Sequence, residues 1–285
     1  MHSVPYDQLI QPLPRYCFKA LYYKAINSLM RGVGRWSTGI DLGYRYGFDS
    51  GVMLEYVYCN QAQGRYGIGV WLDRLYLNAP GWVGIRQRGE LVREELKALA
   101  REKARNKSGP VKIVDLACGG GRYVLEALRD LSDLDVQAIL RDYRVENVCC
   151  AQTLAQDMGI QAIIEQADAF SDDDLALILK EQPDIVVVSG LHEIIDNDGL
   201  VARHLRQIAA ILGQGGSLLL TIQPEHPQLE FIARVLPSHT GRMWVMRLRP
   251  CELTRRWVEE AGLYFVGKKM ENKGIFGVIR VDKLV

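Results

Sequence analysis

Residues 111–128 read VKIVDLACGGGRYVLEAL, and this stretch decides the fold. It begins with an apolar run typical of a buried strand, continues through three consecutive glycines at 119–121, and ends in an amphipathic helical pattern. Glycines between a strand and a helix let the backbone approach a ligand closely, and the first helical turn offers unpaired N–H groups. The stretch therefore predicts a ligand-binding turn at the carboxyl end of a strand.

The same alternation of strand and helix continues beyond this turn. Strand-like runs occupy residues 112–117, 136–143, 161–170, 184–190, 217–224, 264–271 and 274–281. Helical patterns separate the earlier runs, which is typical of a mostly parallel sheet with helices on both faces. No helix separates the last two runs, so they should pair as an antiparallel hairpin. We therefore expect an α/β fold with a seven-stranded, mostly parallel sheet.

Composition divides the chain into two regions. Residues 1–110 hold 16 Lys and Arg against 9 Asp and Glu, together with ten of the 13 tyrosines, whereas residues 111–285 hold 19 basic against 25 acidic residues. A charged helical run ends at residues 107–110, KSGP, where glycine and proline stop a helix. We expect a basic, mainly helical cap at residues 1–110 and a ligand-binding domain at residues 111–285.

The overall composition indicates a globular protein and gives no sign of a zinc site or a disulfide framework. With 285 residues, 48% hydrophobic and 24% charged, the chain is typical of soluble globular proteins and long enough to bury a core. Its six cysteines form no CxxC pair, so neither a zinc site nor a disulfide framework is expected. The first sixteen residues lack a signal-peptide pattern. We therefore expect a cytoplasmic protein without a metal.

The glycine turn fits some cofactors and excludes others. A dinucleotide fingerprint would need a third glycine where Val124 stands, and the lysine of a nucleoside-triphosphate loop is missing. Asp142 ends the second strand, 21 positions after Gly121, where a carboxylate can hold two ribose hydroxyls. Asp168 ends the third strand, where its side chain or a nearby N–H group can contact an adenine edge. The pattern thus argues against NAD.

At these residues the chain resembles class I S-adenosylmethionine (SAM)-dependent methyltransferases. VDLACGGGRYVLEAL (114–128) resembles their first motif, and Asp142, DAF (168–170) and VSGLHE (188–193) resemble the later ones. Two further segments resemble a bacterial methyltransferase family whose members are sometimes fused behind an α/β-hydrolase domain. These are GRYGIGVWLDRLYLNAPGWVGIRQR (64–88) and QPEHPQLEFIAR (223–234), and the likeness extends over residues 50–281.

The resemblance implies SAM as cofactor, S-adenosylhomocysteine as product and a Rossmann-like fold. Gly119 and Gly121 would lie against the methionine part of SAM, and Asp115 would anchor the turn or the amino group. Asp142 would bind the ribose and Asp168 the adenine. The predicted cofactor-binding residues are Asp115, Ala117, Gly119, Gly121, Asp142, Tyr143, Asp168, Ala169 and Ser189. Ala117 stands where the usual motif has a glycine, a small change that should not remove binding.

Candidate catalytic residues follow the fourth strand. His192 and Glu193 lie where ligands meet open α/β sheets, and histidine is the natural base near neutral pH. Either could take a proton from the methyl acceptor; helix capping or support of a neighbouring residue is the alternative. Arg65, Arg74 and Arg86 are candidates for binding an anionic acceptor or the carboxylate of SAM, and the loop histidine His226 is a further candidate for binding the acceptor.

An amphipathic helix is expected at residues 18–30, with Phe18, Tyr22 and Leu29 on its apolar stripe and lysines beside it. It could pack on the catalytic domain or in a dimer, or lie on an anionic membrane surface. A peripheral position at the inner membrane surface and an oligomer are therefore both open.

The function expected from these patterns is SAM-dependent transfer of a methyl group to oxygen or nitrogen of a small or lipid-like acceptor. One alternative is a SAM-binding regulatory or partner subunit without catalysis. Another is a nucleic-acid methyltransferase, which the net charge of +1 disfavours. The Asn/Asp-Pro-Pro-Tyr signature of enzymes that methylate exocyclic amines is also missing after the fourth strand, where VSGLHE stands.

Overall fold

The computed structural model describes residues 4–284, which form two compact units. Unit 1 contains the residues up to Arg86 together with Glu225–Leu248, and unit 2 contains Gln87–Pro224 together with the residues from Arg249 onward. The division falls earlier than the predicted boundary after residue 110, and it assigns a second, later segment to unit 1. The units are described one at a time.

Unit 2 is built on a seven-stranded sheet in the order β3-β2-β1-β4-β5-β7-β6. Its strands are β1 (Val111–Asp115), β2 (Val136–Asp142), β3 (Ile163–Gln166), β4 (Ile185–Val188), β5 (Ser217–Ile222), β6 (Tyr264–Met270) and β7 (Gly277–Asp282). The first five strands are parallel, whereas β7 pairs antiparallel with both β5 and β6. The predicted sheet and its carboxyl-terminal hairpin are confirmed.

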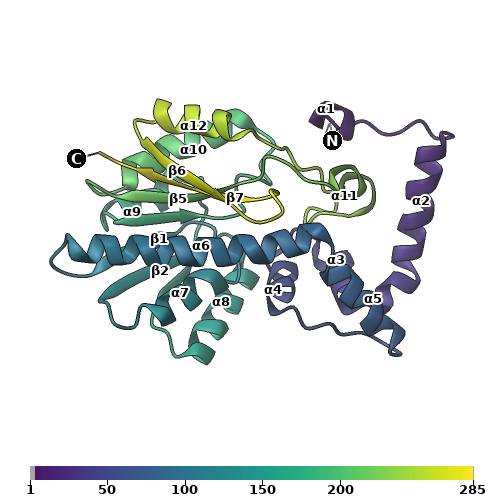
Figure 1. The fold of residues 1–285 in the computed structure, drawn as a ribbon, viewed down its shortest axis with the longest axis horizontal. Coiled ribbons are helices and arrows are strands. Elements are labelled where there is room, and N and C mark those ends of the chain that lie inside the picture. The colour runs from purple at the N-terminus through teal and green to yellow at the C-terminus, as the bar shows by residue number, and fades with distance from the viewer. Residues whose placement is uncertain (1–3, 285) are drawn as a thin grey trace. The chain divides into compact units, whose positions relative to one another are not determined.

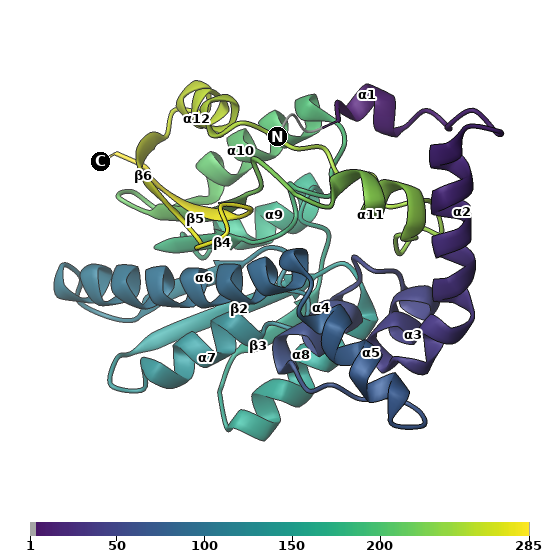
Figure 2. The ribbon, with the colours of Figure 1, turned by 45° about the vertical axis from the view of Figure 1, so that its right-hand side comes forward.

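Helices cover both faces of this sheet (Figures 1 and 2). They are α6 (Pro80–Arg105, from Gln87 onward in unit 2), α7 (Arg122–Asp130), α8 (Val145–Met158), α9 (Asp172–Leu179), α10 (Asp198–Ile211) and α12 (Cys251–Glu260). Buried residues of α9, α10 and α12 share one apolar core with Ile279 and Val281 of β7. Arg280, between them, faces the other side and binds Glu102 of α6 through two hydrogen bonds of 2.6 Å. Helices α6, α7 and α8 therefore cover the opposite face.

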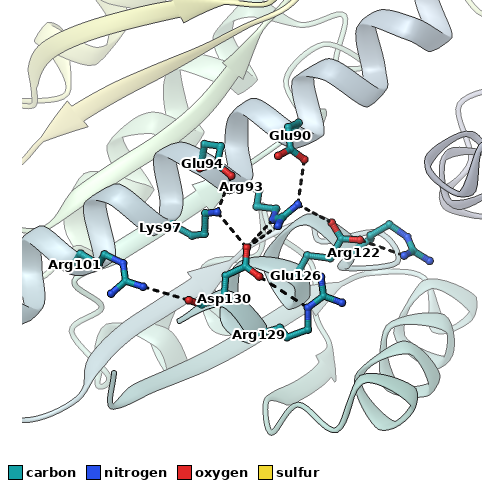
Figure 3. Close-up of polar contacts among 9 residues, drawn as sticks. All are labelled: Glu90, Arg93, Glu94, Lys97, Arg101, Arg122, Glu126, Arg129 and Asp130. Carbon is teal, nitrogen blue, oxygen red and sulfur yellow. Dashed lines mark hydrogen bonds and ion pairs between the residues drawn. The ribbon is translucent and has the colours of Figure 1, made fainter. Parts of the chain in front are cut away.

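A network of charged side chains fixes α6 beside α7 (Figure 3). Arg93 contacts Asp130 at 2.6 Å and Glu126 at 3.7 Å, and Lys97 contacts Asp130 at 3.1 Å. These ion pairs hold the charged run after Arg86 against α7 of unit 2. The predicted boundary missed this because the charged face of a helix looks the same in sequence whether its partner is solvent or another helix.

Unit 1 is helical and is held by one buried carboxylate. Its elements are α1 (Tyr6–Leu9), α2 (Phe18–Arg31), the 3-10 turn η1 (Val33–Trp36), α3 (Thr38–Tyr46), α4 (Gly51–Cys59), α5 (Ile68–Leu77), the start of α6 and α11 (Leu229–Val235). Asp73 of α5 is fully buried. It accepts hydrogen bonds from Ser37 Oγ (2.5 Å), the Gly39 N–H (2.7 Å), Tyr56 Oη (2.5 Å) and the Gln63 N–H (2.9 Å). One side chain of α5 thus joins this helix to the start of α3, to α4 and to the loop before α5.

Helix α2 packs on α11 along one side. Asn27 Nδ2 donates to the Val235 carbonyl at 2.9 Å, and Lys19 pairs with Glu230 at 2.6 Å. The helix predicted at residues 18–30 is therefore present and lies on its own unit. Among the described residues, every helix is too short or too polar to cross a membrane.

Candidate active site

The glycine turn between β1 and α7 combines close packing with an open side. Gly119 and Gly121 adopt left-handed φ angles of +56° and +70°, which favour glycine. A Cβ atom on Gly121 would lie 2.8 Å from Leu140 Cδ2, so this glycine lets α7 approach β2. A Cβ atom on Gly119 would meet nothing within 4 Å. Gly121 therefore serves packing, and Gly119 presents bare backbone to open space.

Asp142 at the end of β2 is bonded directly to this turn. Its Oδ2 accepts from the Gly119 N–H at 3.0 Å, and its Oδ1 accepts from the Arg144 N–H at 2.9 Å and from Asn147 Nδ2 at 3.0 Å. The carboxyl ends of the neighbouring parallel strands β1 and β2 bring these groups together. The structure thus joins the predicted ribose-binding carboxylate to the predicted methionine-binding glycine.

Asp115 ends β1 beneath the turn and is fully buried. It accepts hydrogen bonds from Tyr123 Oη at 2.8 Å and from the Ala117 N–H at 3.3 Å. Burial raises the pKa of Asp115 to about 7, and the nearby Asp142 acts in the same direction. A cation placed beside this carboxyl would favour its ionised form, as expected for a group that meets a ligand's ammonium.

The remaining predicted cofactor residues lie around the same strand ends. Asp168 is exposed, and its Oδ1 accepts from the Phe170 N–H at 2.9 Å, which closes the turn after β3. Tyr143 is exposed, Ala117 is half-buried, and Ala169 and Ser189 are buried.

A second polar group lies where β4 and β5 end. Thr221 donates to Glu193 Oε1 at 2.6 Å and accepts from the Gly190 N–H at 2.8 Å. Burial raises the pKa of Glu193, and the guanidinium of Arg88 acts in the opposite direction. A carboxylate with a raised pKa is a better proton acceptor, so Glu193 is chemically suited to the predicted role.

His192 forms a buried pair with His204 of α10, with 2.9 Å between His192 Nε2 and His204 Nδ1. Burial lowers the pKa of both rings, that of His204 to about 4 and that of His192 well below its usual value. Both imidazoles are therefore neutral near pH 7, and the lowered pKa makes each a weaker proton acceptor than a free imidazole.

Several buried polar atoms gather at this edge without a hydrogen-bond partner among residues 4–284. They are Ser189 Oγ, His192 Nδ1, Glu193 Oε2 and Gln223 Nε2. Such atoms are rare in folded proteins and are typical of sites where a ligand or ordered water completes the hydrogen bonding. Gln223 was not predicted, although a glutamine directly after the apolar strand 217–222 was the signal that could have identified it.

Two buried arginines, Arg88 and Arg249, were also not predicted as site residues from the sequence. Arg249 donates to Asp198 Oδ1 (2.9 Å) and to the carbonyls of His192 (2.7 Å) and Ile195 (2.6 Å), and so fixes the segment after β4. Arg88 lies over the ring of Phe276 with its guanidinium carbon 4.9 Å from the centroid. Arg88 ends the segment 64–88 quoted above, but its partner Phe276 and the partners of Arg249 are distant in the sequence, so neither contact could be predicted.

The four predicted acceptor-binding residues belong to unit 1, whereas the cofactor and catalytic candidates belong to unit 2. Arg65 and Arg74 are exposed. Arg86 is half-buried and donates to the Leu77 carbonyl at 2.9 Å. His226 is buried, accepts from the Gln228 N–H at 3.1 Å, and has its pKa lowered by burial to about 4. It is therefore neutral near pH 7 and does not attract an anion by charge.

Comparison with protein families matches residues 2–283 to the family described as "Putative methyltransferase". The chain belongs to this family. The chain is also 39% identical over 267 residues to the "Uncharacterized protein YnbC" of Escherichia coli (strain K12). The match covers 90% of the chain but 44% of that relative, so the chain spans less than half of its length.

Solved structures share the fold of this methyltransferase family member. One, from Bordetella parapertussis, is described as a possible exported protein; the TM-score is 0.58 at 20% identity, over 83% of this chain and 80% of that one. Another is the magnesium protoporphyrin IX methyltransferase of Synechocystis PCC 6803 with bound S-adenosylhomocysteine; the TM-score is 0.55 at 13% identity, over 85% and 99% of the two chains. The methyltransferase family and the Rossmann-like methyltransferase fold expected from the sequence are confirmed.

Proposed function

We propose that this protein transfers a methyl group from SAM to oxygen or nitrogen of a small or lipid-like acceptor. The observation that carries the proposal is the glycine turn. Gly119 presents bare backbone to open space, and its N–H is bonded to the carboxylate that ends the next strand. This arrangement, in a member of a methyltransferase family, suits a cofactor with an amino-acid part and a ribose.

The residues around the turn fit SAM. Asp142 has two carboxylate oxygens near the turn and would accept from the ribose hydroxyls. Asp115, whose pKa burial raises to about 7, would ionise beside the cofactor's ammonium. When bound, SAM supplies a methyl group on a positively charged sulfur. Tyr143, Asp168, Ala169 and Ser189 complete the proposed site.

The edge at β4 and β5 suits the acceptor. A hydroxyl or amine that gains a methyl group must lose a proton. Glu193 Oε2 and His192 Nδ1 are buried and have no partner among the described residues. Burial raises the pKa of Glu193 and lowers that of His192, so Glu193 is the better suited of the two to accept that proton. Gln223 Nε2 and Ser189 Oγ would orient the acceptor by hydrogen bonds.

Unit 1 supports a lipid-like, anionic acceptor. Within it, residues 1–86 hold ten of the 13 tyrosines and nine basic against five acidic residues, which suits an apolar tail beside an anionic group. Arg65 and Arg74 are the exposed basic side chains proposed to meet that group.

The first test is calorimetry with SAM, S-adenosylhomocysteine and NAD, followed by transfer of a labelled methyl group to fractionated small molecules and lipids. We expect binding of the first two ligands, no appreciable binding of NAD, and label in one fraction. His192→Gln or Glu193→Gln should lower transfer by about 100-fold or more while S-adenosylhomocysteine still binds. SAM binding without any transfer would favour a regulatory subunit, and tighter binding of NAD would overturn the proposal.

A further inference from the structure

The amino-terminal part of unit 1 carries basic side chains over a long stretch that has no acidic ones. Residues 8–40 contain five basic side chains and no acidic one. Two of the five form ion pairs with residues outside this stretch: Lys19 with Glu230 and Arg35 with Asp41. Arg15, Lys24 and Arg31 have no ion-pair partner among residues 4–284 and are exposed. Their charge is therefore available to an external anionic partner.

The same segment exposes apolar side chains. On α2, Phe18, Leu21, Tyr22 and Leu29 each expose more than half of their surface, and Tyr16 just before the helix is 91% exposed. Their spacing of three, four and seven residues places them on one side of the helix. Asn27 and Lys19 bond α2 to α11 from another side, so the exposed stripe is not the one that stabilises unit 1.

Helix α5 carries a second stripe of the same kind. Ile68, Trp71 and Leu75 are each more than half exposed, as is Tyr66 before the helix. Exposed Arg65 and Arg74 lie beside them in the sequence.

The turn η1 connects the two stripes. The ring centroids of Trp36 and Tyr66 are 5.6 Å apart, and the Arg65 N–H donates to the Trp36 carbonyl at 2.9 Å. Val33 of η1 is exposed as well. Apolar side chains are therefore exposed on both elements that adjoin η1.

We propose that unit 1 binds the surface of an anionic lipid bilayer through the exposed apolar side chains of α2 and α5. Apolar and aromatic side chains flanked by lysine and arginine are typical of helices that lie in a membrane interface. Basic side chains near an anionic leaflet each add to binding. A second copy of the chain paired through the same stripe is a poorer partner, because it would bring the exposed Arg15, Lys24 and Arg31 of the two copies toward each other.

The test is co-sedimentation with vesicles of phosphatidylcholine alone and of phosphatidylcholine with about a third phosphatidylglycerol. We expect binding to the anionic vesicles, weaker binding in high salt, and little binding to the neutral ones. Phe18→Ser/Leu29→Ser and Lys24→Glu/Arg31→Glu should each lower the vesicle-bound to free ratio at least fivefold. The matched controls are Leu177→Ser and Arg256→Glu, which change exposed residues of unit 2 and should leave that ratio within twofold.

Equal binding to both vesicle types, or loss of binding in the controls but not in the α2 variants, would overturn the inference. The inference would also be overturned if the protein bound no vesicles and formed a dimer that the α2 variants dissociate, since the stripe would then contact a second copy of the chain. Calorimetry with S-adenosylhomocysteine on the same variants keeps the two proposals apart. Vesicle binding by a protein that binds no SAM would contradict the proposed function and leave this inference standing.

Discussion

Each unit of the protein buries one aspartate completely, and the two carboxylates are satisfied differently. Asp73 of unit 1 accepts four hydrogen bonds, from two backbone N–H groups, a serine and a tyrosine. Asp115 of unit 2 accepts two, and burial raises its pKa to about 7. Four donors fill the acceptor capacity of the Asp73 carboxylate, as in a structural junction. Asp115 has acceptor capacity left for a ligand beside the glycine turn.

Of the substitutions that test this comparison, removal of the Asp73 carboxylate should lower the stability of the protein most. Asp73→Ala leaves four donors without their acceptor and should lower the free energy of unfolding by about 4 kcal/mol, because bonds to charged groups are the costliest to lose. Hydrogen exchange should show lost protection in α3, α4 and α5 but not in β1 and β4. Asp41→Ala, which removes ion pairs to Arg35 and Arg45 near the surface, is the control and should cost less than about 1 kcal/mol. Equal losses in the two variants would contradict the role of Asp73 as a junction.

Asp115 should make the stability of unit 2 depend on pH. Its folded pKa of about 7 lies above the unfolded value near 3.9, so from pH 4 to 7 the unfolded chain binds fewer protons than the folded one. The free energy of unfolding therefore falls as pH rises through this window, by on the order of 4 kcal/mol in total.

Urea unfolding of the wild type and of Asp115→Asn across this window checks the prediction. The two should be close in stability at pH 4, where both side chains are neutral, and the wild type should be the less stable at pH 8. A difference that does not change with pH would mean that Asp115 is already ionised throughout.

The parts of unit 2 that could be predicted are those that depend on residues close together in the sequence. The strand, glycine turn and helix at 111–128 follow from a local pattern, and Asp142 from its place at a strand end. Arg249 could not be predicted, because its partners are a carboxylate at 198 and two carbonyls at 192 and 195. Such contacts depend on the folded path of the chain.

Unit 1 was less predictable for the same reason. Asp73 is one aspartate in an otherwise ordinary helical pattern, and nothing nearby in the sequence indicates that four donors converge on it. The sequence predicts a boundary after residue 110, whereas the first segment of unit 1 ends at Arg86. The two differ because ion pairs to Asp130 and Glu126 hold the charged part of α6 on unit 2. Its charges predict a helix but not the surface on which it lies.

A smaller effect is expected at Asp142. Asp142→Ala should weaken binding of S-adenosylhomocysteine by about 1.5–3 kcal/mol, the range for hydrogen bonds to a charged group. Asn147→Ala is the control, because it removes one support of this carboxylate and leaves the carboxylate in place. Calorimetry should show at least about a tenfold loss for the first variant and less than threefold for the second. An Asp142→Ala protein that folds normally and binds within twofold would remove this residue from the site.

The most direct test of the account compares two glycines of unit 2. Gly119 and Gly159 have similar positive φ angles of +56° and +66°, and a Cβ atom on either would meet nothing within 4 Å. Gly119→Ala and Gly159→Ala should therefore cost similar stability, about 1–2 kcal/mol. If Gly119 presents its backbone to the cofactor, calorimetry with S-adenosylhomocysteine will show at least a tenfold weaker Kd, about 1.4 kcal/mol, for Gly119→Ala and a change within twofold for Gly159→Ala. Unchanged affinity in Gly119→Ala would contradict the placement of the cofactor at this turn.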